Sequence, residues 1–384
     1  MGKRSNGAGR GARRPRAVAW LLAAGIAGCG HGTPPAQPPA VPAPQPAARA
    51  APPLPPPQWS TVDGVGAAAR FANPKGLAFD SAGNLFVADT QDRIIRRISP
   101  DGAVSTFAGQ PGQEGHEDGI GASARFAGPH GLAIDAHDNL FVTDEADATI
   151  RKITPAAEVS TVAGSAGRTG SLDGIGAAAT FDYPLGITID AADNLYVVAQ
   201  SAIRKISRRG VVTTLAGRAG EGTGAAAGLR GYRDGKIANA LFQDPSGIAI
   251  DRRGNLFVVD SGNAVIRKIS PGGLVTTFAG TAGRRGYADG KGAAAAFFLP
   301  AGIVIDANST LYVTDCRAAM VRRISPKGLV TTAARAGCAS GVAIDAHGAL
   351  YVSVGRMGST GRWSGAILKV SRSGDVTTFA GRAP

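Results

Sequence analysis

FQDPSGIAIDRRGNLFVVDSGNAVIRKISPGGLVTTFAG, residues 242–280, contains four short runs rich in β-branched and aromatic residues. The runs are Gly247–Ile250, Asn255–Val259, Val265–Ile269 and Val275–Ala279. Such runs, separated by turn residues, are typical of β-strands. The first connection contains Gly254, which suits a left-handed turn conformation, and Asp251, whose carboxylate can accept hydrogen bonds from the turn backbone. We therefore predict an antiparallel meander of four strands.

The same unit is repeated six times between Phe71 and Gly381. The glycine that opens its first run recurs at Gly76, Gly131, Gly186, Gly247, Gly302 and Gly341, with spacings of 55, 55, 61, 55 and 39 residues. One four-stranded sheet cannot bury both of its faces alone, whereas sheets stacked as blades around an axis can. The repeat therefore predicts an all-β, six-bladed β-propeller.

A short insert precedes five of the six units and lengthens their spacing. The inserts are DGVGAAARF (63–71), DGIGASARF (118–126), DGIGAAATF (173–181), DGKIANALF (234–242) and DGKGAAAAF (289–297). The units themselves share F-x-x-P-x-G-[IL]-x-[IF]-D, N-L-[FY]-V, I-R-[KR]-I and V-[ST]-T, which resembles the NHL repeat over about 310 of the 384 residues. The resemblance implies a six-bladed propeller with four antiparallel strands per blade. It implies no particular activity, because one fold carries many functions.

Residues 1–28 are typical of an export signal. Six basic residues precede an apolar run, Ala17–Ile26, that is too short to span a bilayer as a helix. The following Ile26-Ala27-Gly28-Cys29 resembles a bacterial lipobox, which implies cleavage before Cys29 and lipid attachment to its thiol. An ordinary signal peptide with an incidental cysteine is the alternative. Twin-arginine export through Arg13-Arg14 lacks the apolar pair expected after the arginines.

Residues 29–58 are dominated by proline and alanine and contain too little apolar side chain to favour folding. An extended polyproline II segment of this length would reach about 90 Å at ~3.1 Å per residue. We predict a disordered tether between the lipid anchor and a propeller over residues 59–384. A ligand for proline-recognition domains is the alternative.

The formal net charge of +13 falls once the predicted signal is removed. The remaining 35 basic and 28 acidic residues give +7. This excess suits a solvated surface, although acidic polysaccharide, phospholipid headgroups or nucleic acid would also be attracted to it. Export argues against nucleic acid as a partner.

Charged residues recur in the second and third runs. Aspartate recurs at Asp89, Asp144, Asp260 and Asp315, and arginine at Arg96, Arg151, Arg267 and Arg322. In the sixth unit, Val354 and Leu368 replace both charged residues. Their joint replacement predicts an ion pair within each blade, because loss of one partner would leave the other charge without a counterion. The third unit fits this rule less well, since Ala199 stands near the aspartate position while Arg204 remains.

Cys316 and Cys338 lie in two loops that a propeller places on the same face. Export permits disulfides, so we predict a bridge between these cysteines, with two free thiols as the alternative. Val376–Ala380 completes the sixth blade by itself. Trp59–Val62 could then add to its edge or pack nearby.

The mouth of the central channel is the usual ligand site of a propeller. Its six positions are Lys75, His130, Leu185, Ser246, Ala301 and Ser340. Some NHL-like enzymes, such as peptidyl-hydroxyglycine lyases, hold zinc with several histidines, but only His130 occupies such a position, and catalytic zinc usually needs three protein ligands. Gluconolactonase-like relatives hold calcium with carboxylates. The insert aspartates lie on this face, yet each precedes glycine, which favours an Asx-type turn. We predict no catalytic residue, metal or cofactor.

Two inserts, taken with the residues that lead directly into them, place an aromatic ring among arginines: Arg230, Tyr232 and Arg233 in one, and Arg284, Arg285 and Tyr287 in the other. Arginine and tyrosine are favoured in recognition patches. Together with Lys75 and His130, these residues predict a ligand-binding mouth for an envelope protein or polysaccharide, on an exported, membrane-anchored module. An enzyme at the mouth, either a metal-assisted lyase or a lactonase-like hydrolase, is the alternative. A sensor domain would need a transmembrane link.

Overall fold

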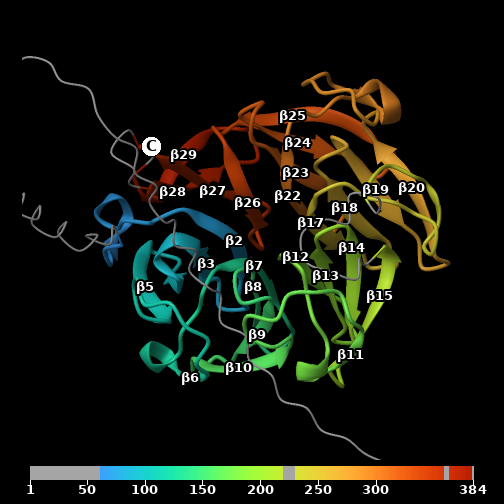
Figure 1. Cartoon of the computed structure of the whole chain (residues 1–384). Coiled ribbons are helices and arrows are strands. Elements are labelled where there is room, and N and C mark those ends of the chain that lie inside the picture. Colours follow the sequence, from blue (N-terminus) through green and yellow to red (C-terminus); the bar gives the residue numbers. More distant parts are fainter. Residues whose placement is uncertain (1–60, 219–229, 359–362, 383–384) are drawn as a thin grey trace, which may run out of the picture. The chain divides into compact units, whose positions relative to one another are not determined.

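The computed structural model describes residues 61–218, 230–358 and 363–382. Cys29, Trp59 and the predicted signal and tether lie outside these described residues. Within them, six antiparallel sheets surround a central axis (Figure 1). The predicted six-bladed β-propeller is confirmed.

Each blade contains four strands in a meander that runs outward from the axis. The innermost strands are β2 (Pro74–Phe79), β7 (Pro129–Ile134), β12 (Pro184–Ile189), β17 (Pro245–Ile250), β22 (Pro300–Ile305) and β26 (Ala339–Ile344). The second strands are β3 (Leu85–Asp89), β8 (Leu140–Asp144), β13 (Leu195–Ala199), β18 (Leu256–Asp260), β23 (Leu311–Asp315) and β27 (Leu350–Met357). The third strands are β4 (Ile94–Ile98), β9 (Thr149–Ile153), β14 (Ala202–Ile206), β19 (Val265–Ile269), β24 (Met320–Ile324) and β28 (Trp363–Val370). The fourth strands are β5 (Ala103–Ala108), β10 (Glu158–Ala163), β15 (Val211–Gly217), β20 (Leu274–Ala279), β25 (Leu329–Arg335) and β29 (Val376–Gly381).

Blades one to five carry a fifth strand that the prediction of four strands per blade omits. These two-residue strands are β1 (Gly64–Val65), β6 (Gly119–Ile120), β11 (Gly174–Ile175), β16 (Gly235–Lys236) and β21 (Gly290–Lys291). Each comes from an insert and pairs with the outer edge of its own blade. The inserts are rich in glycine and alanine, which have low strand propensity, so their sequence does not indicate this pairing.

Short 3-10 helices complete most of the inserts. They are η1 (Gly66–Ala68), η3 (Gly121–Ser123), η4 (Gly176–Ala178) and η5 (Gly292–Ala294), while η2 (Thr90–Asp92) follows β3. No helix of the described residues is long and apolar enough to cross a membrane.

The first hairpin of blade four has the predicted turn chemistry. Gly254 has a φ of 78°, and the Asp251 carboxylate accepts hydrogen bonds from the backbone of Arg253 at 2.9 Å and Asn255 at 2.8 Å. The Asp251 carboxylate therefore accepts the hydrogen bonds of two backbone amides in the turn that joins β17 to β18.

The hydrophobic core is divided among the seams between neighbouring blades. Each seam has its own buried cluster of aliphatic and aromatic side chains. The last residue of each insert fills the seam in front of its blade: Phe71, Phe126, Phe181, Phe242 and Phe297 are at most 1% exposed. Burying one such side chain stabilises a seam by roughly 1.5–3 kcal/mol.

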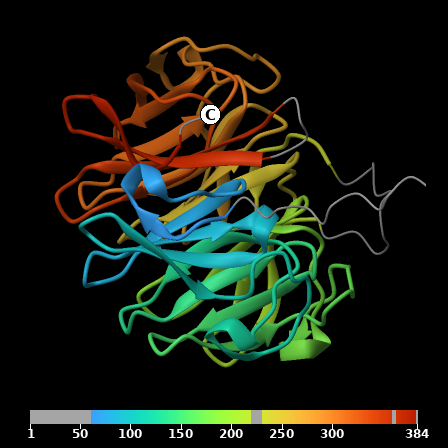
Figure 2. The same ribbon diagram turned by 90° about the vertical axis from the view of Figure 1, so that its left-hand side faces the viewer.

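The ring closes where blade one meets blade six (Figure 2). Phe71 pairs with Gly365 of β28, and the hydroxyl of Ser353 donates to the Lys75 carbonyl at 2.6 Å. Blade six takes all of its described strands from the C-terminal part of the chain. Val62 pairs with Arg70 of its own insert, so this residue belongs to blade one and does not extend the sheet of blade six.

Candidate functional site

The central channel is built from one tripeptide of each innermost strand. Each tripeptide has a variable residue, a glycine and an aliphatic residue, and together they line a cavity of about 190 Å³. The variable residues are Lys75, His130, Leu185, Ser246, Ala301 and Ser340. The six mouth positions predicted from the repeat thus lie in one wall.

The glycines of these tripeptides bring neighbouring blades into close contact. A Cβ atom added to Gly131 would overlap the carbonyl of Leu185 in the next blade, and one on Gly341 would overlap the carbonyl of Lys75. The other four glycines face the next blade in the same way. The repeated glycine is therefore needed for packing around the channel.

Hydroxyl groups tie the blades together at the same level. The Thr143 hydroxyl accepts from the Gly131 amide at 2.7 Å and donates to the Leu185 carbonyl at 2.7 Å. Thr314 and Ser353 make the same kind of bridge at two other seams. Ser246 donates to the Ala301 carbonyl at 2.8 Å. These hydroxyls serve the scaffold.

Among the described residues that line the channel, Lys75 and His130 are the titratable ones, and the charge of Glu145 acts on Lys75. Lys75 Nζ donates to the Ser340 hydroxyl at 3.2 Å. Burial lowers the pKa of Lys75, while the negative charge of Glu145 acts in the opposite direction. Burial also raises the pKa of Glu145, opposed by the charge of Lys75.

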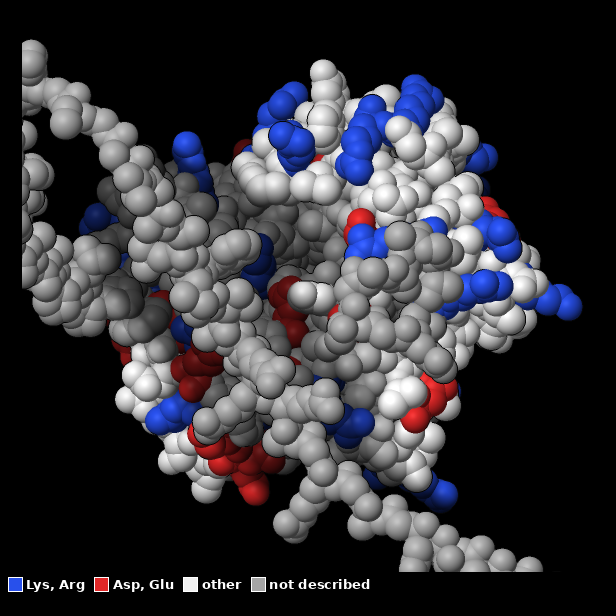
Figure 3. Space-filling view, in the orientation of Figure 1, with Lys and Arg blue, Asp and Glu red and all other residues white. Residues whose placement is uncertain are grey.

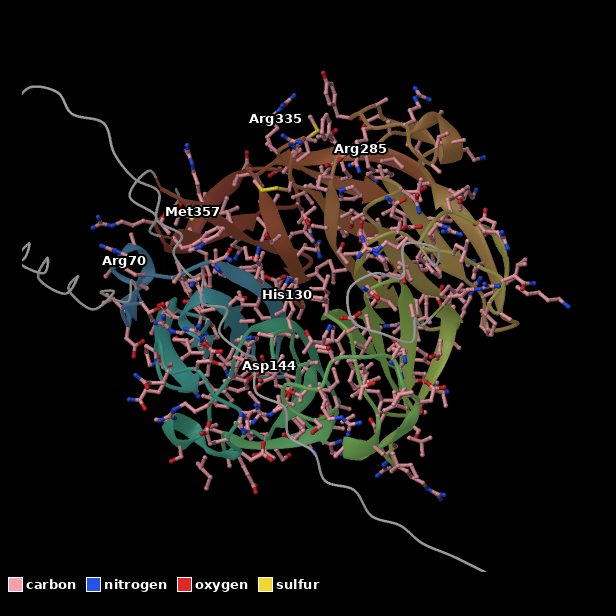
Figure 4. All side chains as sticks on the ribbon, in the orientation of Figure 1. Arg70, His130, Asp144, Arg285, Arg335 and Met357 are labelled. Carbon is pink, nitrogen blue, oxygen red and sulfur yellow. A yellow bond between two sulfur atoms is a disulfide. The ribbon has the colours of Figure 1, made fainter. Side chains whose placement is uncertain are left out.

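His130 is a neutral imidazole near the centre of the ring (Figure 4). Burial, with a smaller contribution from the charge of Lys75, lowers the pKa of His130 to about 3. Its Nδ1 has no hydrogen-bond partner among the described residues. The mouth therefore offers a cation and an uncharged polar ring to a ligand.

Sequence reasoning missed Glu145. It follows Asp144 at the end of β8, one residue beyond the last strand residue, and its loop reaches the mouth from outside the innermost strand. The equivalent positions in other blades hold unlike residues such as Thr90 and Ser261. The repeat pattern therefore contains no signal that marks this position.

Arg230 and Tyr232 of the fourth-blade insert have partners within the chain. Arg230 forms an ion pair with Asp244 at 2.8 Å. Tyr232 Oη lies 2.6 Å from the Thr277 hydroxyl, and its ring lies 4.9 Å from the Arg267 guanidinium. Tyr232 thus covers a buried arginine, while the side chain of Arg233 is exposed.

The fifth-blade insert presents a more open group. Arg285 donates to the carbonyls of Gly262, at 3.1 Å, and Phe298. Arg284 is exposed, and Tyr287 is 65% exposed. Figure 3 shows basic side chains gathered over this upper part of the ring, whereas acidic side chains gather over blades one and two at the lower left.

The recurring arginine of the third strand is buried in a network that the sequence predicts only in part. In blade two, Arg151 lies 3.7 Å from Asp144 and 2.7 Å from Asp118 of the insert. It donates to the carbonyls of Arg125 and Glu117 and stacks over Phe126 at 5.2 Å. The ion pair with the second-strand aspartate is present, but the closer partner is the insert aspartate.

This finding corrects the interpretation of the insert aspartates as Asx-type turn residues. Asp63, Asp118, Asp173, Asp234 and Asp289 each form an ion pair with the arginine of their own blade at 2.6–2.9 Å. In blade three, Arg204 therefore keeps a partner, Asp173, although Ala199 has replaced the second-strand aspartate. The persistence of Arg204 was the signal in the sequence that a second partner exists.

Burial has a strong effect on the second-strand carboxylates. It raises the pKa of Asp89 to about 8, with the neighbouring Asp92 adding to the shift, and that of Asp144 to about 6. Each lies beside its arginine at 0% exposure. These groups lie inside the blades and do not line the channel.

Cys316 and Cys338 form a disulfide between the end of β23 and the connection that enters blade six. The predicted bridge is therefore present, on the same side of blades five and six as the channel mouth. Among the described residues, no three His, Cys, Asp or Glu side chains gather as a metal site.

Comparison with known proteins identifies relatives through the repeats. No protein-family model matches the chain. SUPPRESSOR OF QUENCHING 1 of Arabidopsis thaliana is 27% identical over 279 residues, covering 68% of this chain and 26% of that protein. NHL repeat-containing protein 2 of Bos taurus is 31% identical over 181 residues, covering 43% of this chain and 24% of that protein. The chain thus spans about a quarter of the length of these curated relatives.

Solved structures share the propeller fold at low identity. A Bacteroides thetaiotaomicron protein of unknown function matches with a TM-score of 0.57 and 17% identity over 80% of this chain and 72% of that one. An auxiliary nutrient binding protein from the same organism matches at 0.53 and 14%, over 78% and 70%. A gluconolactonase of Xanthomonas campestris matches at 0.51 and 15%, over 78% and 87%. Proteins with this fold thus include both binding proteins and an enzyme.

The six repeats, the ring of six blades and the similarity to NHL repeat-containing protein 2 together support an NHL-repeat β-propeller.

Proposed function

We propose that this chain is an exported, membrane-anchored binding module that recognises an envelope protein or polysaccharide through the loops around the channel mouth. The observation that carries this proposal is the distribution of polar groups. The channel wall consists mainly of glycine, small and aliphatic residues. Of its two serine hydroxyls, that of Ser246 donates to the Ala301 carbonyl and that of Ser340 accepts from Lys75. Charged side chains gather on the face of the ring around the mouth (Figure 3).

The charge pattern suits a large polar ligand. Arg284, Arg285 and Tyr287 lie on the fifth-blade insert, and acidic side chains lie across the mouth over blades one and two. Arginine and tyrosine contribute strongly to recognition because they combine apolar contact area with hydrogen bonding and charge. Lys75 and His130 would contact any ligand group that enters the channel.

The proposed anchor rests on the N-terminal sequence, where a basic segment, an apolar run and Ile26-Ala27-Gly28-Cys29 follow one another. Lipid on Cys29 would hold the propeller at a membrane surface that faces the periplasm or the exterior. Cell fractionation tests the anchor: the wild-type chain should sediment with membranes, and Cys29→Ser should move to the soluble fraction. Equal membrane association of both would refute the lipid anchor.

Affinity capture from envelope extract tests the mouth. The full-length chain is compared with Arg284→Glu/Arg285→Glu and with the control Arg252→Glu/Arg253→Glu. The control reverses the charge of two exposed arginines in the β17–β18 turn, on the opposite face of the ring. A partner retained by the wild type and the control but lost by the mouth variant would support the proposal. Equal capture by all three proteins would contradict it.

An enzyme at the mouth is the second candidate, because Lys75 and His130 line one cavity and have shifted pKa values, as does Glu145, whose charge acts on Lys75. Groups with shifted pKa values often mark catalytic sites. Its test measures hydrolysis of gluconolactone above the spontaneous rate, with Lys75→Met and Glu145→Gln as variants. Hydrolysis that both variants abolish would favour the enzyme. If gluconolactone is hydrolysed only at the spontaneous rate with all three proteins, this lactonase activity is excluded.

A further inference from the structure

Blade six lacks the element that covers the outer edge of each other blade. In blade one, Gly64 and Val65 of β1 pair with Val104 and Ala103 of β5, and blades two to five repeat this pairing. The sheet of blade six ends at β29, in the order β26-β27-β28-β29. The backbone edge of β29 is therefore without a strand partner among the described residues.

The exposed fraction of equivalent valines measures this difference. The valine that faces the insert strand is 0–4% exposed in blades one to five: Val104, Val159, Val212, Val275 and Val330. Its counterpart in blade six, Val376, is 36% exposed. An apolar side chain is thus open to solvent where the fold elsewhere buries it.

The amide and the hydroxyl of Thr378, which lies close to Val376 in β29, also differ from their counterparts in the other blades. In blade two, the amide and hydroxyl of Thr161 both donate to the insert carboxylate of Asp118 at 3.0 Å. Thr214, Thr277 and Thr332 bond their own insert aspartates in the same way. The equivalent Thr378 is exposed, and no carboxylate of the described chain bonds to it.

A groove of about 670 Å³ occupies the place of the missing insert. Val354 and Leu368 line it at the positions of the buried aspartate and arginine in other blades. Ala336 also lines it, at the position of the seam phenylalanine, three residues before the innermost strand. Met357 and Trp363, on the longer β27–β28 hairpin, form another wall. The groove combines apolar surface with an open strand edge.

The charge of the groove indicates what it accepts. Its lining includes Arg335 and Arg356, both exposed, and no aspartate or glutamate. Arg335 and Met357 lie away from His130 at the centre of the ring (Figure 4). The groove is therefore distinct from the channel mouth.

We propose that blade six binds an extended segment of a partner protein in this groove. The segment pairs its backbone with β29, places an apolar side chain against Val354 and Leu368, and brings a carboxylate to Thr378 and the two arginines. The five inserts show that this blade architecture accepts such a segment. The chain's own residues 34–57 are a poor substitute, since proline has no amide hydrogen for edge pairing.

Direct binding of a synthetic peptide tests the proposal. The probe is EDGIGASARFAG, the sequence of residues 117–128, with a fluorescent label. The control peptide replaces Ile120 and Phe126 by serine. The full-length chain is compared with Val376→Glu and Thr378→Pro, which respectively repel the carboxylate and remove the outward amide. Leu274→Glu, at the exposed start of β20 in a complete blade, is the matched control. Denaturant unfolding establishes that each variant is folded.

We expect the wild type and Leu274→Glu to bind the probe, and both groove variants to bind it at least about tenfold more weakly. The serine peptide should lose binding similarly. Failure of the wild type to bind, or equal binding by the folded groove variants, would overturn the proposal. Dimerisation of the wild type without peptide, lost in Val376→Glu, would also overturn it by identifying a second copy as the occupant.

Discussion

Blades one to five and blade six bury the same seam in different ways. Each of the first five blades closes its outer edge with an insert whose aspartate pairs with a buried arginine. Blade six has neither the insert nor the buried ion pair: Val354 and Leu368 occupy the central positions, and the Cys316–Cys338 disulfide links it to blade five. The insert, the aspartate and the arginine disappear together, which shows that they form one structural unit.

The physical reason is the cost of an unpaired buried charge. A buried arginine is stabilised only while carboxylates and carbonyls surround it. If the insert alone were lost, the arginine would lose its closest ion pair and two carbonyl acceptors. Apolar residues at both positions avoid this cost, because neither buried charge is then present.

The largest effect should come from Arg151→Leu, which introduces the blade-six residue into blade two. Asp144 then loses its buried cation, and we expect a loss of roughly 3–5 kcal/mol in the free energy of unfolding, measured by urea titration. The double variant Arg151→Leu/Asp144→Val should be more stable than the single variant. A double variant less stable than the single one would show that the two charges are not coupled in this way.

Removal of the disulfide should have the next largest effect. Closure of a loop with 22 residues of separation stabilises by about 3 kcal/mol in the chain-entropy model. Cys316→Ser/Cys338→Ser should therefore unfold at a lower urea concentration. Reducing agent should lower the urea midpoint of the wild type to the same value. An unchanged midpoint for the reduced wild type would contradict a stabilising role.

A smaller loss is expected for Gly131→Ala at the channel, because its Cβ would overlap the Leu185 carbonyl and separate two blades. Overpacking of this kind costs roughly 1–3 kcal/mol. Gly272→Ala is the control, since its nearest neighbouring atom would lie 3.9 Å away. Equal thermal stability of the two variants would show that close packing of the blades does not require glycine at this position.

The smallest expected effect is a change in pH dependence that contrasts blade one with blade six, where Val354 and Leu368 replace the buried aspartate and arginine. Burial raises the pKa of Asp92 to about 6, above its unfolded value of about 3.9. The folded chain therefore holds a proton that the unfolded chain releases between about pH 4 and 6, so this contribution to stability is complete below pH 4 and is lost as pH rises.

Urea unfolding across this range checks the sign. Asp92→Asn should flatten the fall in stability between about pH 4 and 6. The control Asp138→Asn should change the pH dependence of stability only below about pH 4, because hydrogen bonds from Ser81 lower the pKa of Asp138. An unchanged slope in Asp92→Asn would contradict the protonated form of this buried carboxyl.

Most of the fold follows from local sequence signals. Val265–Ile269 was predicted with the bounds that the structure has, because β-branched residues and flanking turns mark the strand at both ends. The channel positions followed from the repeat, since the same residue opens the innermost strand each time. The disulfide was predictable because both cysteines lie in loops of one face.

The features that sequence reasoning missed depend on contacts between distant segments. Asp118 and Arg151 are separated by 33 residues, and the glycine beside the aspartate gave a sufficient local explanation for it. Glu145 reaches the mouth from a loop outside the innermost strand. Tyr232 looked like a recognition residue, yet the structure also gives it an internal contact with Arg267. Its role in ligand binding stays a prediction.

Hydrogen exchange at the outer strands tests the central claim that blade six has an open edge. The amide of Thr161, which donates to Asp118, should exchange slowly, and that of Thr378 should exchange rapidly in the free chain. Addition of the peptide EDGIGASARFAG should slow exchange at Thr378 and leave Thr161 unchanged. Equal protection of Thr378 and Thr161 without peptide would contradict the account, since the edge of β29 would then already be covered.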